Sequence, residues 1–124
     1  MSNQSINKKA LEDILSPKIK SIYKNQLKHQ LDNISYYLFE RTLIVILEGT
    51  VTAPEKILNN HQKICLAKQV RKVIDNAIQP QIRSIIEEAM NVKVIDFLCD
   101  TTLESNCTSA IVIFERQKPL NSSI

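Results

Sequence analysis

The chain has 124 residues, of which 44% are hydrophobic and 23% are charged, as is typical of one globular domain. Its single glycine, Gly49, excludes glycine-rich phosphate loops and the GxSxG nucleophile elbow. The longest apolar runs, LIVIL and AIVIF, are far shorter than the about 20 residues that span a membrane. The first twenty residues contain no apolar stretch either. These patterns predict a cytoplasmic protein that is not an integral membrane protein.

The net charge of +3 is concentrated near the N-terminus. Lys20, Lys24 and Lys28 are spaced four residues apart, which places them on one face of a helix. This candidate basic surface suits contact with the phosphates of a nucleic acid or of an anionic lipid. The alternative is a solvated helix face. No arginine and no exposed aromatic residue accompanies the lysines, so nucleic acid is the less favoured partner.

In chain order, residues 1–9 are polar and are expected to form a flexible N-terminus. From Ala10 to about Gln30, apolar residues recur every three or four positions, which predicts an amphipathic helix. Pro17 leaves two alternatives. Either Ser16 caps a helix that begins at Pro17, or Pro17 kinks one longer helix.

Two strands, 33–40 and 43–48, follow as an expected antiparallel hairpin, because both segments are rich in β-branched and aromatic residues. Gly49 ends the second strand. Thr52 and Glu55 then match a capping box, with proline in the first turn, which predicts the N-terminus of a helix. The Asn59–Asn60 pair is expected to loosen this helix locally.

Pro80 predicts a kink or break near Gln79 and a second helix that continues to Met90. The QPQIR run at this point could be a hinge or a partner groove, although a structural kink is the simpler interpretation. Asn91 is a plausible left-handed C-cap. A second hairpin is expected to follow, with these parts: strands 92–99 and 107–115, a polar loop 100–106, and a flexible tail 117–124.

The order helix–hairpin–kinked helix–hairpin predicts an α+β fold, in which one four-stranded antiparallel sheet packs with the helices in a single domain, 10–116. The runs LIVIL and AIVIF are apolar on both faces of their strands. Either the helices wrap both faces of the sheet, or a second copy of the protein covers one of them. The second alternative predicts a homodimer.

Three acidic residues, Asp96, Asp100 and Glu104, fall in the second hairpin and form a candidate acidic cluster. A pair of carboxylates could perform acid–base chemistry or bind a hard cation. The alternative is turn capping, which is expected of Asp100 because it opens the predicted loop. Asp96 alternates with apolar neighbours and should point to solvent or to a partner.

The cysteines, Cys65, Cys99 and Cys107, are odd in number and lack a CxxC motif, which favours reduced core thiols. Together with His61 they could supply four zinc ligands, but their spacing does not match a structural zinc site. Arg71 and Lys72 are interpreted as solubilising charges. No catalytic residue, metal ligand or cofactor is predicted.

The segments GTVTAPEKILNN and AKQVRKVIDNAIQPQIRSIIEEAMNVKVIDFLCDTTLE resemble the MpsC-like family, a small bacterial family named for a Na⁺-translocating system that generates membrane potential. The resemblance covers about residues 10–116. Its most telling residues are Thr52, Glu55, Lys56, Arg71 and Asp100. The chain departs from the family pattern at Asn91, where glycine is usual; asparagine tolerates the same left-handed backbone.

The resemblance implies an association with ion or inorganic-carbon transport, or with signalling, and it brings no catalytic residues. The leading hypothesis is a non-enzymatic homodimeric interaction or regulatory module that docks on a membrane-associated protein. One alternative is a sensor of a small molecule or ion, with a pocket between the helices and the sheet. The other is a nucleic-acid or anionic-lipid binder that uses the basic first helix.

Overall fold

The computed structural model describes residues 8–115 and contains three helices and four strands. The helices are α1 (Lys8–Leu27), α2 (Ala53–Asn60) and α3 (Ile64–Met90). The strands are β1 (Asn33–Phe39), β2 (Thr42–Glu48), β3 (Val94–Thr102) and β4 (Cys107–Phe114). The predicted α+β fold is confirmed. The tail predicted at 117–124 and most of the N-terminus predicted at 1–9 lie outside the described residues, but Lys8 and Lys9 belong to α1.

The helix α1 runs through Pro17 without a break, so the longer of the two predicted helices is the one that forms. Its buried stripe has helical spacing and packs into the core. The helix stops at Leu27, short of the predicted Gln30, because Lys28 adopts a left-handed conformation with φ +52°. The Lys28 amide donates to the Lys24 carbonyl at 3.1 Å, which closes the last turn.

Of the kink or break predicted near Gln79, the break is wrong, because α3 continues through Pro80 to Met90. Ile78, Ile82 and Ile86, on both sides of the proline, are buried in the same core, and this packing outweighs the about 3 kcal/mol that an internal proline costs. The break instead separates α2 from α3 at 61–63, just beyond the Asn59–Asn60 pair.

The four strands form one antiparallel sheet with the order β1-β2-β4-β3. Both predicted hairpins are present, and a register irregularity between Val94 and Asp96 interrupts the second. The prediction that Asp100 opens a loop is wrong. Asp100 pairs with Ser109 inside the sheet, because β3 extends to Thr102 and its threonines suit a strand.

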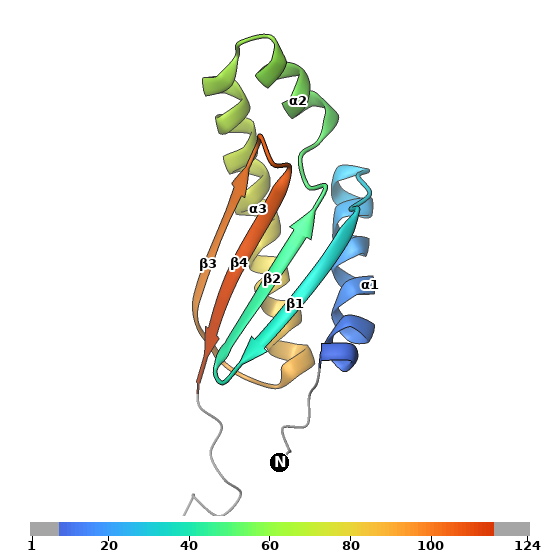
Figure 1. Cartoon of the computed structure of the whole chain (residues 1–124), viewed down its shortest axis with the longest axis vertical. Helices are drawn as coiled ribbons and strands as arrows, with labels where there is room; N and C mark the ends of the chain where they lie inside the picture. The colour runs from blue at the N-terminus through green and yellow to red at the C-terminus, as the bar shows by residue number, and fades with distance from the viewer. Residues whose placement is uncertain (1–7, 116–124) are drawn as a thin grey trace, which may run out of the picture.

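The helices α1 and α3 both lie against one face of the sheet (Figure 1). Alternate residues of the central strands point into the core on that face, among them Leu43, Val45, Ala110 and Val112. Two ways to cover the sheet were predicted. The first is wrong, because the helices do not wrap both faces. The opposite face of the sheet carries no helix of the described chain.

Candidate functional site

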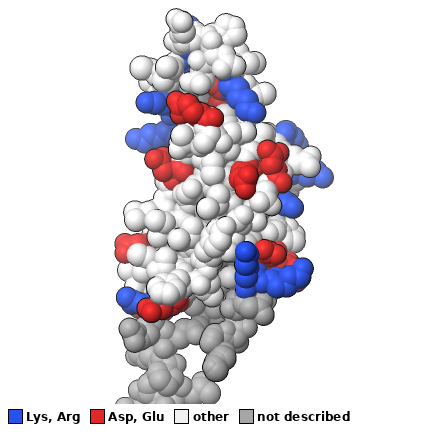
Figure 2. Space-filling model, viewed as in Figure 1, with Lys and Arg blue, Asp and Glu red and all other residues white. Residues whose placement is uncertain are grey.

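The uncovered side of the sheet, here named the open face, has an apolar centre. The register aligns four side chains in one row across the strands: Tyr37, Ile44, Ile111 and Leu98. Leu98 is 60% exposed, and Phe39, in the neighbouring row, is 73% exposed. In Figure 2 a mostly uncharged band runs along this side of the molecule, with charged side chains flanking it. Such a continuous apolar surface is typical of a site where another molecule docks.

The candidate acidic cluster does not come together as a pair of carboxylates. Asp96 and Asp100 both lie on the open-face side of β3, where they pair with Ile113 and Ser109 of β4. Four residues of strand separate their backbones by about 13 Å. Glu104 lies in the turn beyond β3. These carboxylates therefore form a spaced acidic edge along β3, which is too open for two groups to share one proton.

A buried polar network joins α2 to α3, and its centre is Arg71. Arg71 is only 5% exposed, so its interpretation as a solubilising charge is wrong. Its Nε and Nη2 donate to the two carboxylate oxygens of Glu55 at 2.7 and 2.8 Å. Nη2 also donates to the Thr50 carbonyl at 2.9 Å, and Nη1 donates to Asp75 at 3.1 Å. This network ties the start of α2 to α3 and to Thr50 in the segment before α2.

Glu55 has a second role in the same network, at the N-cap of α2. Its carboxylate accepts hydrogen bonds from the Thr52 amide at 2.9 Å and from the Thr52 hydroxyl at 2.8 Å. Glu55 is fully buried. A buried carboxylate needs a counter-charge and several donors, and Arg71 and Thr52 together provide them.

A cleft of about 740 Å³ opens beside this network, between α3 and the end of β3. Arg71 and Asp75 line it together with two residues of the opposite wall, Asp100 and Glu104. Burial raises the pKa of the Asp75 carboxyl, and the hydrogen bond from Arg71 works against that shift. Cys99 also lines the cleft, and burial raises the pKa of its thiol to about 12. A thiol with this pKa stays protonated at neutral pH and is a poor nucleophile.

All three cysteines are free thiols, but they do not form a common site. Cys65 is exposed, which contradicts its prediction as a core residue, because its part of α3 extends beyond the sheet (Figure 1). Cys99 and Cys107 are partly buried. Within residues 8–115, no three His, Cys, Asp or Glu side chains converge closely enough to hold a metal ion.

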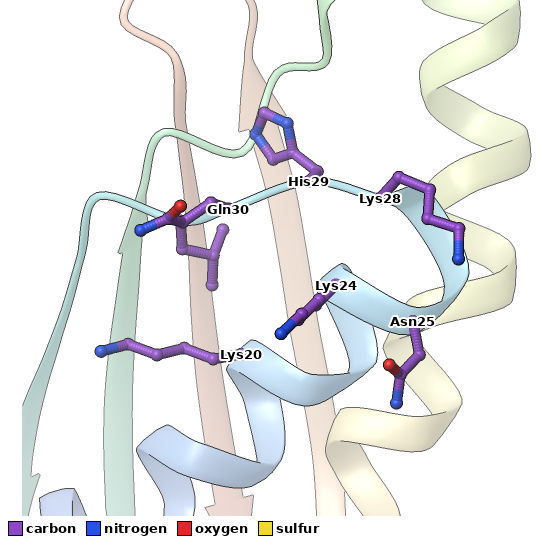
Figure 3. A pocket seen from close by; sticks show the side chains of 7 residues that line it. Lys20, Lys24, Asn25, Lys28, His29 and Gln30 are labelled. Atoms are coloured by element: carbon purple, nitrogen blue, oxygen red, sulfur yellow. The ribbon is translucent and has the colours of Figure 1, made fainter.

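The candidate basic surface borders a hollow of about 620 Å³ at the C-terminal end of α1. Lys20, Lys24 and Lys28 all line it, joined by His29 and Gln30 from the segment that follows the helix. Figure 3 shows Lys20 and Lys24 extending to the same side of α1, whereas Lys28 extends from the helix end on the other side. Lys20 and Lys24 share one face of α1 as predicted, whereas the prediction is wrong for Lys28, which lies beyond the end of the helix. The position of His29 in this pocket could not be predicted from residue spacing.

Sequence reasoning missed the network at Arg71 and the cleft beside it. Glu55 and Arg71 are sixteen residues apart, and no local pattern pairs them. The available signal was the capping box, because a glutamate that is held at a buried helix start requires a cation nearby.

The fold and these sites define the protein as a small α+β domain with two long helices on one face of a β1-β2-β4-β3 antiparallel sheet. Among the described residues, no helix is both long and apolar enough to cross a membrane. The family model described as Na⁺-translocating membrane potential-generating system (MpsC) matches residues 7–116, and the chain belongs to this family. No curated protein and no solved structure matches the chain.

Proposed function

We propose that the protein is a non-enzymatic interaction module that forms a homodimer through the open face. The observation that carries this proposal is the apolar centre of the open face, which the helices leave uncovered and where Leu98 is 60% and Phe39 is 73% exposed. Each square ångström of apolar surface removed from water stabilises an association by roughly 25 cal/mol before the costs of binding are subtracted.

The dimensions of the open face suit a small dimer. Four strands about 4.8 Å apart, each about seven residues long, make a face of about 19 Å by 23 Å. The side chains stand out from this plane and enlarge its accessible area. The face therefore approaches the roughly 600 Å² per partner at the lower end of stable interfaces. A second copy offers an apolar surface of matching size, which is the simplest occupant of the face.

The charges at the edges of the open face favour one of two symmetric arrangements. If the two-fold axis ran across the strands, β3 would lie over the partner's β3, and the acidic edges at Asp96 and Asp100 would repel each other. If the axis runs along the strands, β3 lies over the partner's β1. The β1 edge carries Lys8, whose ammonium lies 5.2 Å from the centre of the Tyr37 ring. The second arrangement also places Ile44 over the partner's Ile111.

This arrangement predicts a dimer that charge reversal can break and restore. We expect the native protein to be a dimer at micromolar concentration, and Ile44→Asp or Ile111→Lys alone to shift it to a monomer in analytical ultracentrifugation. Mixing the two variants should restore dimers, because the carboxylate introduced in one chain then faces the ammonium introduced in the other. Val73→Lys is the matched control, since Val73 is exposed on α3, away from the open face.

Three outcomes would count against the proposal. A monomeric native protein removes the dimer altogether. Dimers that survive both substitutions place the interface elsewhere on the molecule. Failure of the mixed variants to pair, with each single variant monomeric, rejects the axis along the strands and favours the other arrangement.

The family description points the same module toward a membrane system. We expect the dimer to dock on, and regulate, a membrane-associated ion-transport complex from the cytoplasmic side. Cross-linking in the native cells, with Ile111→Lys as the comparison bait, tests whether a transport protein is captured only by the dimer.

A second candidate function, a small-molecule or ion sensor, is supported by the cleft between α3 and β3. One wall carries Lys68 and Lys72, and the other carries Asp100 and Glu104, so the cleft suits a ligand with both charges. Tight binding should raise Tm by mass action. A thermal-shift panel of free amino acids and other zwitterions tests this function. No shift for any compound, or an equal shift in the Lys72→Gln and Glu104→Gln variants, would reject the cleft as the sensor site.

A further inference from the structure

The pocket at the C-terminal end of α1 has walls that are held in place by hydrogen bonds. Lys28 is fixed in the left-handed conformation by its bond to the Lys24 carbonyl, and the His29 amide donates to the Tyr23 carbonyl at 3.2 Å. The His29 ring donates from Nε2 to the Gly49 carbonyl at 2.6 Å. The segment after α1 is therefore tied both to the helix and to the end of β2. The lysine side chains extend from these anchored backbone positions (Figure 3).

The charge around this pocket has one sign. None of the residues that line it is acidic. Within residues 8–115, the ion pairs involve Lys9 and Arg71, and none involves the three pocket lysines. Like charges four residues apart on a helix repel each other. An anion between Lys20 and Lys24 would remove this repulsion, and within residues 8–115 no carboxylate forms an ion pair with either of them.

The helix dipole explains only part of this arrangement. A cation in the last turn of a helix is stabilised by the dipole, and Lys24 occupies that turn. The effect fades within one turn, and Lys20 lies about two turns before the end of α1. The helix dipole therefore does not stabilise the charge of Lys20, which lies on the same face of α1 as Lys24 and borders the same hollow.

We propose that the pocket binds a phosphate group, carried either by a soluble phosphorylated compound or by an anionic lipid headgroup. The lysine ammoniums supply mobile point charges, which suit phosphate oxygens. A hollow of about 620 Å³ has room for more than one phosphate. The pocket lies at the helix side of the sheet, so it stays accessible when the open face is covered (Figures 1 and 3). The proposal does not depend on the dimer.

The test uses inorganic pyrophosphate as the soluble probe and phosphatidylglycerol vesicles as the lipid probe, both at low ionic strength. Amide chemical-shift mapping by NMR should place the pyrophosphate response in residues 20–31. The triple variant Lys20→Gln, Lys24→Gln, Lys28→Gln should bind at least tenfold more weakly, since each exposed charge pair accounts for up to about fivefold. The charge-matched control, Lys56→Gln, Lys63→Gln, Lys93→Gln, changes exposed lysines outside both the pocket and the cleft and should keep most of the affinity. Thermal unfolding of each variant verifies that it is folded.

The two probes separate the sources of the phosphate. Lysine-dependent binding of pyrophosphate alone assigns the pocket to a soluble compound, and lysine-dependent binding of the vesicles assigns it to a lipid headgroup. Equal losses in the pocket variant and in the control would overturn the proposal, because net charge would then explain the binding. Absence of binding to both probes would also overturn it. So would lysine-dependent retention of single-stranded RNA without a response to either probe, which would indicate a surface for a nucleic-acid backbone.

Discussion

Replacing Arg71 by methionine is expected to lower the free energy of unfolding by about 3–5 kcal/mol, the usual cost of removing one partner from a buried ion pair. The substitution would leave the Glu55 carboxylate, which is fully buried, without its counter-charge. It would also leave the Thr50 carbonyl without the donor at 2.9 Å. Methionine keeps most of the side-chain volume, so a cavity adds little. Urea denaturation followed by circular dichroism measures the change.

Neighbouring variants separate the ion pair from general effects of charge. Lys72→Met removes an exposed cation one residue away and should change stability by no more than about 0.5 kcal/mol. The stability loss caused by Arg71→Lys should fall between those of Arg71→Met and Lys72→Met, because one ammonium cannot replace two parallel N–H donors. Combining Glu55→Gln with Arg71→Met should cost clearly less than the sum of the single changes. If Arg71→Met lowered the free energy of unfolding as little as Lys72→Met does, the network would not stabilise the fold.

Replacing Gly49 by alanine is expected to cost about 2–4 kcal/mol. Gly49 has φ +80°, in the left-handed region that side chains disfavour. A Cβ at this position would lie 2.5 Å from Oδ2 of Asp32 and 3.0 Å from its backbone nitrogen. The Asp32 amide donates to the Glu48 carbonyl at 2.8 Å, so the backbone there cannot move away without losing that bond. A fall in Tm of about 10 °C in calorimetry would match this cost.

The Asp32→Ala background divides the cost of Gly49→Ala into two parts. Without the Asp32 carboxylate, only the backbone strain and the contact with the Asp32 nitrogen remain, so the loss should shrink to about 1–2 kcal/mol. Asn33→Ala, at the next and exposed position, is the control and should leave the cost unchanged. An equal loss of stability from Gly49→Ala in the native, Asp32→Ala and Asn33→Ala backgrounds would mean that the contact with the Asp32 carboxylate does not contribute. A neutral Gly49→Ala would show that the left-handed backbone is not required.

Local patterns in the sequence were sufficient for the order of the elements. Alternating and helical spacing of apolar residues predicted both hairpins and the long helices, because one buried face is enough to define each element. Asn91 adopts the left-handed C-cap conformation expected of it, with φ 55° and ψ 50°. The local signals failed at Pro80 and at Asp100. At both positions, packing or strand pairing across the sheet outweighs the preference of the residue itself.

By itself, the sequence determined the fold class, the two hairpins, the start of α2 and the shared helix face of Lys20 and Lys24, since each depends on neighbours within a few residues. Only the tertiary structure decided which face of the sheet the helices cover, and therefore that the open face exists. It also decided that Arg71 is buried against Glu55 and that His29 closes the basic pocket against Gly49. These contacts join residues sixteen to twenty positions apart. Their partners are selected by the way the helices pack on the sheet, and no periodicity along the chain encodes that packing.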